Sequence, residues 1–151
     1  MGAVTYPEVK VAEFVNGRLV PIQLLFDAQP YATDFNVKWT PTMITLDETG
    51  KEHHRVVGFL PPEQFIPAML LGIGKTNFDL DKFNEALADL EKIIADFPKS
   101  KAVPEAIFLR GVAGYKSTHD PKPLKEAYEK LQAEHPENEW TDRALPYRLL
   151  P

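Results

Sequence analysis

The residues best placed to do chemistry lie just ahead of a β-like run at 42–47. Trp39, Thr40 and Pro41 combine an aromatic side chain with a stiff backbone, and such a loop can dock an extended peptide through aromatic area and main-chain hydrogen bonds. A Thr–Pro linkage also allows a cis peptide bond at a low free-energy cost. We expect a peptide-binding loop at these three residues. The alternative is a structural turn with Trp39 partly buried.

The other residues that could bind a metal or phosphate or take part in catalysis lack the spacing that such sites need. His53 and His54 are adjacent in an expected strand, so their side chains alternate between faces and cannot hold one metal. The run 72–75, Gly-Ile-Gly-Lys, lacks the spacing of a phosphate loop and follows a helix, so we expect Gly72 and Gly74 to end that helix. No serine, histidine and aspartate set stands out. We therefore expect no catalytic residues, no cofactor and no metal.

The chain of 151 residues contains no cysteine. Thiolate nucleophiles, disulfides, cysteine–metal sites and Cys-X-X-Cys redox chemistry are therefore excluded for the sequence as it stands. We expect no catalysis from this chain.

Charge and hydropathy limit the classes of partner that the chain can be expected to bind. The formal net charge is −5 and basic residues are interspersed with acidic ones, so there is no positive stripe for nucleic acid. No apolar run has the length of a membrane span, and residues 1–20 show no basic segment followed by an apolar one. We expect a cytoplasmic, bacterial protein whose partner is a protein or peptide, not nucleic acid or membrane.

The first half of the chain alternates between helical and strand patterns. The expected elements are a helix from Pro7 to Gly17, a strand at 19–26, helical turns at 31–35, strands at 42–47 and 53–59 joined by a hairpin turn at Gly50, and a helix from Pro61 or Pro62. Residues 19–26 read LVPIQLLF, a nearly continuous apolar run typical of a strand buried on both faces. This order predicts a three-layer α/β domain with a mixed sheet.

After residue 76 only helical patterns remain. A helix is expected over 80–97 with Pro98 after it, another from Pro104, and a third ending before Pro136. Residues 90–106 align with residues 128–144 at an offset of 38. The identical pairs are Glu91/Glu129, Lys92/Lys130, Ala95/Ala133, Pro98/Pro136 and Ala106/Ala144. A unit of helix, proline-containing turn and helix therefore repeats, and such units stack to share a core.

The first half resembles the thioredoxin family over about residues 4 to 75. The resemblance rests on Asp27 after a strand, the short helix ending at Phe35, the Thr40-Pro41-Thr42 turn, the 47–51 hairpin, and Gly58-Phe59 before a helix that begins with proline. It implies a thioredoxin-like α/β fold in which Pro41 follows a cis peptide bond. It also implies that Thr40, just before this proline, offers backbone hydrogen bonds to an extended substrate.

The sequence departs from that family at its beginning. The family's Cys-X-X-Cys motif and the strand that leads into it would lie upstream of Met1, so thiol–disulfide exchange cannot be carried over. The resemblance then implies a truncated sheet that lacks the strand between 19–26 and 42–47. Either these two strands pair directly, or a partner chain fills the gap, or the fold is only marginally stable. The second alternative would give a homodimer through the incomplete sheet.

The second half resembles tetratricopeptide-type repeats. Phe83 and Ala86, the Phe97-Pro98 terminator and the 38-residue offset carry the resemblance, although such repeats usually have a period of about 34. We expect a thioredoxin-like domain at 1–76 and an all-α helical-repeat domain at 77–151. The predicted function is a redox-inactive protein-binding or scaffold module. The alternative is a fragment of a thiol-disulfide oxidoreductase whose Cys-X-X-Cys lies upstream of residue 1.

Overall fold

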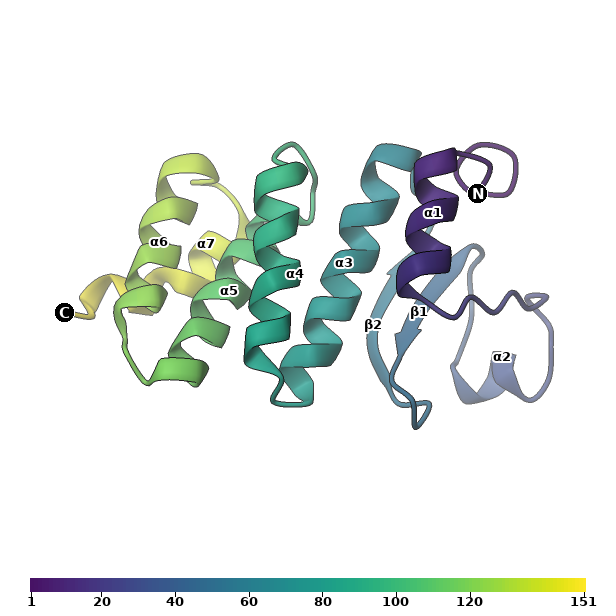
Figure 1. The fold of residues 1–151 in the computed structure, drawn as a ribbon, viewed down its shortest axis with the longest axis horizontal. Helices are drawn as coiled ribbons and strands as arrows, with labels where there is room; N and C mark the ends of the chain where they lie inside the picture. Colours follow the sequence, from purple (N-terminus) through teal and green to yellow (C-terminus); the bar gives the residue numbers. More distant parts are fainter.

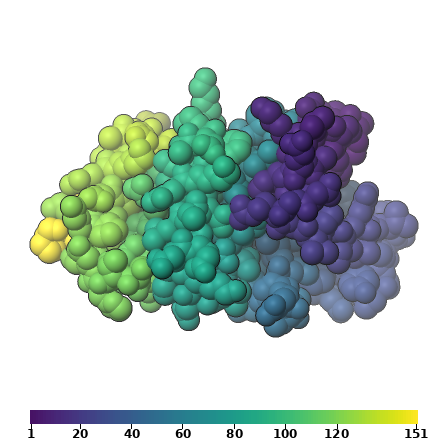
Figure 2. Space-filling model, viewed as in Figure 1, coloured from purple at the N-terminus to yellow at the C-terminus, as the bar shows by residue number.

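Helices that pack in a row dominate the computed structural model, which describes all residues, 1–151 (Figure 1). The elements are α1 (Val9–Arg18), α2 (Tyr31–Asp34), β1 (Thr42–Leu46), β2 (Glu52–Val57), α3 (Pro62–Asp79), α4 (Phe83–Asp96), α5 (Val103–Thr118), α6 (Lys122–Glu134), α7 (Glu139–Ala144) and a 3-10 helix at Leu145–Leu149. Helices α3 to α6 stand side by side, each against the next. The hairpin β1–β2 and α1 lie beyond α3, and at the other end α7 packs against α5 and α6 (Figure 1), so the molecule is elongated (Figure 2).

Prolines mark the helix ends as the sequence predicts. Pro62, Pro104 and Pro123 lie in the first turns of α3, α5 and α6, where the missing N–H leaves no helical hydrogen bond unmade. Pro98 and Pro136 directly follow the C-cap residues of α4 and α6. The three expected helices of the second half are therefore confirmed, with ends that shift by a few residues.

The larger of two cores runs along the row of helices. It is built from 11 buried residues of α3 to α7 and the turn before α5: Leu70, Leu71, Leu90, Ile93, Ala102, Val103, Ala106, Ile107, Ala127, Leu131 and Ala144. Small alanines alternate with leucine and isoleucine, which lets neighbouring helices approach closely and interdigitate. Each helix buries its apolar face against the next helix along the chain.

A second, smaller core joins the hairpin to α3. Val11 from α1 and Phe65 and Met69 from α3 are buried there, and Met43 and Val56 from the two strands pack against them. The strands pair antiparallel, with Met43 opposite Val56. This two-stranded sheet has one face toward α1 and α3.

The hairpin turn has the predicted chemistry. The Asp47 Oδ1 atom accepts hydrogen bonds from the backbone N–H groups of Thr49 at 2.8 Å and Lys51 at 3.1 Å. Gly50 has a φ of 85°, a conformation that glycine adopts without a steric penalty. The prediction of two strands joined at Gly50 is confirmed.

The prediction of a buried strand at 19–26 is wrong. Residues 20–25 belong to no helix, strand or turn, and Val20 and Ile22 are 90% and 78% exposed. A continuous apolar run predicts burial only where neighbouring strands can pair with it. The only sheet consists of β1 and β2, so no neighbour exists. The predicted mixed sheet is wrong for the same reason.

The prediction that Gly72 and Gly74 end a helix is also wrong. Both are buried inside α3, which continues to Asp79. A Cβ on Gly72 would collide with the Thr45 hydroxyl, and one on Gly74 would lie 3.2 Å from a methyl group of Leu90. These glycines let the hairpin and α4 approach the helix closely. The division that we predict after residue 76 falls within this helix.

The turns that follow α4 and α6 share one backbone conformation. Phe97 has φ −128° and ψ 51°, and His135, 38 residues later, has φ −138° and ψ 53°. In each turn the C-cap carbonyl accepts a hydrogen bond from the N–H three residues on, that of Ser100 at 2.9 Å and that of Asn138 at 3.1 Å. The two aligned sequence segments thus make the same turn.

Candidate functional site

Arg55 fixes the segment that leads into the Trp39 loop. Its guanidinium donates 2.7 Å hydrogen bonds to both carboxylate oxygens of Glu52 and a 2.6 Å bond to the backbone carbonyl of Phe35, just after α2. The hydrogen bond from Arg55 lowers the pKa of Glu52, so this pair stays charged at neutral pH. Asn36 then turns the chain with a φ of 48°, which asparagine tolerates better than most residues.

The loop itself presents an aromatic ring and free backbone groups. The Trp39 side chain is 74% exposed, so the alternative of a partly buried tryptophan is wrong. The Thr42 hydroxyl donates to the Trp39 carbonyl at 2.5 Å, and the Gly58 N–H donates to the Pro41 carbonyl at 2.8 Å. The backbone N–H and C=O of Thr40 make no hydrogen bond within the fold, and the Thr40–Pro41 peptide bond is cis. The loop is thus held at both ends and open in the middle.

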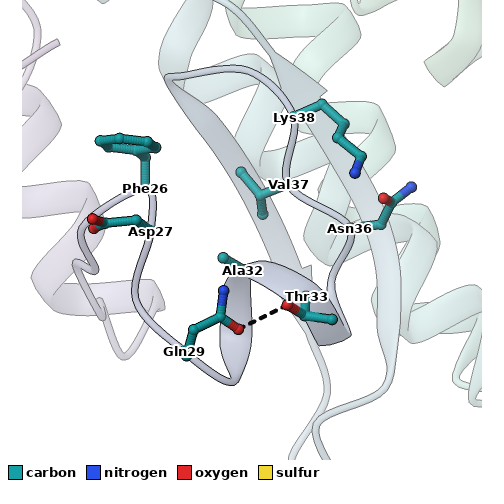
Figure 3. Close-up of a pocket in the computed structure, with 8 residues that line it drawn as sticks. All are labelled: Phe26, Asp27, Gln29, Ala32, Thr33, Asn36, Val37 and Lys38. Carbon is teal, nitrogen blue, oxygen red and sulfur yellow. Dashed lines mark hydrogen bonds between the residues drawn. The ribbon is translucent and has the colours of Figure 1, made fainter.

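A cavity of about 400 Å³ lies beside the segment that precedes the loop (Figure 3). Phe26 and Asp27 form one side, and Asn36, Val37 and Lys38 form the other. The floor contains Gln29, Ala32 and Thr33, with the Thr33 hydroxyl donating to the Gln29 amide oxygen at 2.7 Å. Asp27 and Lys38 lie on opposite sides of this cavity, and the Asp27 carboxylate is directed away from the Lys38 side (Figure 3).

A buried cluster of charged groups lies at the other end of the hairpin. The His53 side chain is fully buried, with Nε2 at 2.8 Å from Asp47 Oδ2 and Nδ1 at 2.6 Å from Asp79 Oδ2. Hydrogen bonds to Asp47 and then to Asp79 raise the pKa of His53, and the bond from His53 holds the pKa of Asp47 well below its usual range. The imidazolium therefore joins the hairpin turn to the end of α3.

His54 has a different environment. Its ring lies against α3 at Gly72, and burial lowers its pKa, with Lys75 as the next contribution. Both nitrogens of His53 are taken by carboxylates, so the two neighbouring histidines share no ligand site. We did not predict the His53 cluster from the sequence. The only sign of this cluster in the sequence is the histidine pair that follows the acidic residues of the hairpin turn.

A comparison against protein families finds a match in the first half of the chain. Residues 5–72 match a family described as a thioredoxin-like domain. This part of the chain is therefore similar to a thioredoxin-like domain. In this domain the Thr40–Pro41 turn precedes β1, as the sequence resemblance implied. Comparisons with curated proteins and with solved structures gave no match.

The match ends within α3, and a mostly helical region follows it. None of the helices combines the length and apolar character needed to span a membrane.

Proposed function

We propose that the chain is a redox-inactive thioredoxin-like protein that binds an extended protein or peptide segment at Trp39, Thr40 and Pro41. The observation that carries the proposal is the open loop: an aromatic ring that is mostly exposed stands next to an unpaired Thr40 backbone. A peptide main chain can pair with Thr40 while an apolar side chain stacks on Trp39. The absence of cysteine leaves binding as the role for this loop.

The helical region is the second part of the proposed scaffold. The shared turn conformation at Phe97 and His135 supports a tetratricopeptide-like repeat of helix, turn and helix. We place this region at 77–151, after a thioredoxin-like domain at 1–76. The protein is proposed to act in the cytoplasm, with a protein partner.

Binding of an unfolded polypeptide tests the proposal. The probe is fluorescein-labelled, reduced and carboxymethylated lysozyme, and fluorescence anisotropy gives its dissociation constant. Trp39→Ala is expected to weaken binding at least about tenfold, since a central aromatic contact typically contributes 2 kcal/mol or more. Tyr115→Ala, which removes an exposed aromatic ring from α5, is the matched control and is expected to leave the constant unchanged.

Two results would count against the proposal. One is the absence of saturable binding by the unaltered chain. The other is equal weakening by Trp39→Ala and Tyr115→Ala, which would assign the binding to general surface hydrophobicity.

A second candidate function is favoured by the open sheet. No hydrophobic residue from 12 to 64 is buried, and 20–25 lie outside any ladder, as expected for a thioredoxin-like domain that lacks its central strand. The chain would then be a fragment of a thiol-disulfide oxidoreductase. The test is to read the gene upstream of Met1 for an in-frame Cys-X-X-Cys. A stop codon there would eliminate this candidate.

A further inference from the structure

β1 has one edge that no strand covers. Because the Gly58 N–H donates to the Pro41 carbonyl and Met43 pairs with Val56, odd-numbered residues of β1 direct their backbone groups toward β2. Thr42 and Ile44 direct theirs away from it. Neither residue has another backbone partner, so two N–H and two C=O groups stand at strand spacing along this edge. Such an edge binds one kind of structure, another extended strand.

The same chain also contains a segment, residues 20–24, that belongs to no helix, strand or turn. From Val20 to Leu24 no backbone group donates or accepts a hydrogen bond. The side chains of Leu25 and Phe26, which follow, are 79% and 69% exposed. Exposure of these apolar side chains to water costs free energy, and pairing with another strand would cover part of that surface.

We propose that two copies of the chain form a homodimer in which residues 20–24 of each copy add a strand to the β1 edge of the other copy. Each copy then gives one strand and receives one, which is the reciprocal contact of a two-fold axis. Neither residues 19–26 nor residues 39–46 contain a charged side chain, so the pairing buries no charge although each chain carries a net charge of −5. The chain thus supplies both halves of the interface.

Pro21 decides which side of the segment pairs. Successive residues of a strand direct their backbone groups to opposite sides, so Val20, Ile22 and Leu24 share one side and Pro21, Gln23 and Leu25 share the other. Proline has no N–H to donate, so a complete row of donors exists only on the side of Ile22. We assign this side to the contact with Thr42 and Ile44.

The assignment gives a matched pair of variants. Ile22→Pro removes a donor from the pairing side, whereas Gln23→Pro removes one from the opposite side. Neither residue makes a backbone hydrogen bond within one copy, and both lie outside every helix, strand and turn, so we expect both variants to keep the monomer fold. Unchanged far-UV circular dichroism verifies this.

Sedimentation equilibrium of the full 151-residue chain at micromolar concentrations is the measurement. We expect a dimer for the unaltered chain and for Gln23→Pro, and at least tenfold weaker association for Ile22→Pro. Hydrogen exchange on the dimer is expected to show slowed amides at Ile22 and Ile44.

Three results would overturn the inference. A monomer at all concentrations would leave the β1 edge to a strand from a different chain. Equal association of both proline variants, or a dimer with unprotected Ile22 and Ile44 amides, would place the contact elsewhere. None of these results depends on Trp39, and Trp39→Ala is expected to leave the dimer intact, so peptide binding and dimerisation can fail separately.

Discussion

The two ends of the molecule bury their residues very differently. Of 27 buried residues, only Thr5 and Val11 precede residue 61, and the other 25 follow it. Both regions contain many apolar residues. In the helical region these residues recur at helical spacing and face a neighbouring helix, whereas the apolar run at 19–26 faces solvent.

The difference shows how each kind of secondary structure completes its core. A helix satisfies its own backbone and needs only an apolar face nearby, which the next helix along the chain supplies. A strand needs a neighbour for its backbone as well, and that neighbour often comes from a distant part of the sequence or from another chain. The helical row is therefore complete, and the sheet is open on both edges.

The strongest test of this contrast is a pair of isoleucine truncations. Ile93, in the large core, is 0% exposed, and Ile93→Ala is expected to lower the free energy of unfolding by about 2–5 kcal/mol. Ile44 in β1 is only partly buried, and Ile44→Ala is expected to lower it by about 1 kcal/mol or less. Urea denaturation gives both values. Equal losses would mean that the two regions are packed alike.

Glycine substitutions probe the closeness of packing. A Cβ on Gly111 of α5 would lie 2.6 Å from the Ala127 Cβ and 2.9 Å from the Pro123 carbonyl oxygen, so Gly111→Ala is expected to cost about 1–3 kcal/mol. Gly17 of α1 has open space around it, and Gly17→Ala is expected to stabilise the fold by about 0.4–1 kcal/mol. The midpoint temperature of thermal unfolding should therefore fall for Gly111→Ala and rise for Gly17→Ala. A stabilising Gly111→Ala would contradict the tight α5–α6 contact.

The ion pair between α1 and α4 tests how the two regions are coupled. Arg18 donates to Asp89 at 2.7 Å, and the Asp89 side chain is only 8% exposed. Arg18→Ala leaves this carboxylate with a single 3.2 Å bond from Asn77, and about 1 kcal/mol of stability should be lost, a value moderated by the partial exposure of Arg18. Lys92→Ala, which removes an exposed pair with Asp96, is the control and should change stability by less than about 0.5 kcal/mol.

The smallest effect expected is a pH dependence from His53. Its folded pKa is raised, so its stabilising contribution is complete below the unfolded value of about 6.5 and disappears as the pH rises through the folded pKa. The Asp47 contribution, with a lowered folded pKa, is lost instead as the pH falls below about 4. The effect is modest because Asp79 is half exposed and solvent screens its charge.

The corresponding measurement is the thermal midpoint as a function of pH. In His53→Gln the thermal midpoint should no longer decrease as the pH rises, whereas in His135→Gln this decrease should remain. A decrease that persists in His53→Gln would assign it to other groups.

Local signals predicted much of this fold. Asp47 and Gly50 lie within one turn, and their side-chain and backbone preferences specify the hairpin without help from the rest of the chain. The helices beginning near Pro62 and Pro104 follow from apolar residues at helical spacing and from prolines in the first turn. A tryptophan next to a rigid turn is visible in sequence, and the peptide-binding loop inferred from it at Trp39 stays a prediction.

Features that depend on distant contacts were missed. Residues 19–26 have the composition of a buried strand, but burial needs neighbours that the sequence of the strand does not specify. Gly72 and Gly74 looked like helix ends because the residues that approach them, such as Thr45 and Leu90, lie far away in the chain. The His53 cluster was missed because its third member, Asp79, lies 26 residues away at the end of another helix.

Helix α3 belongs to both cores, since Phe65 and Met69 lie in the small one and Leu70 and Leu71 lie in the large one. Because α3 is shared by the two cores, the two ends of the molecule should unfold in a fixed order. Detachment of α1 and the hairpin exposes one side of α3 but leaves its contacts with α4 in place. Loss of α3 removes the support of the hairpin entirely. The sheet end should therefore open first and close last, with the helical row serving as the template on which it forms.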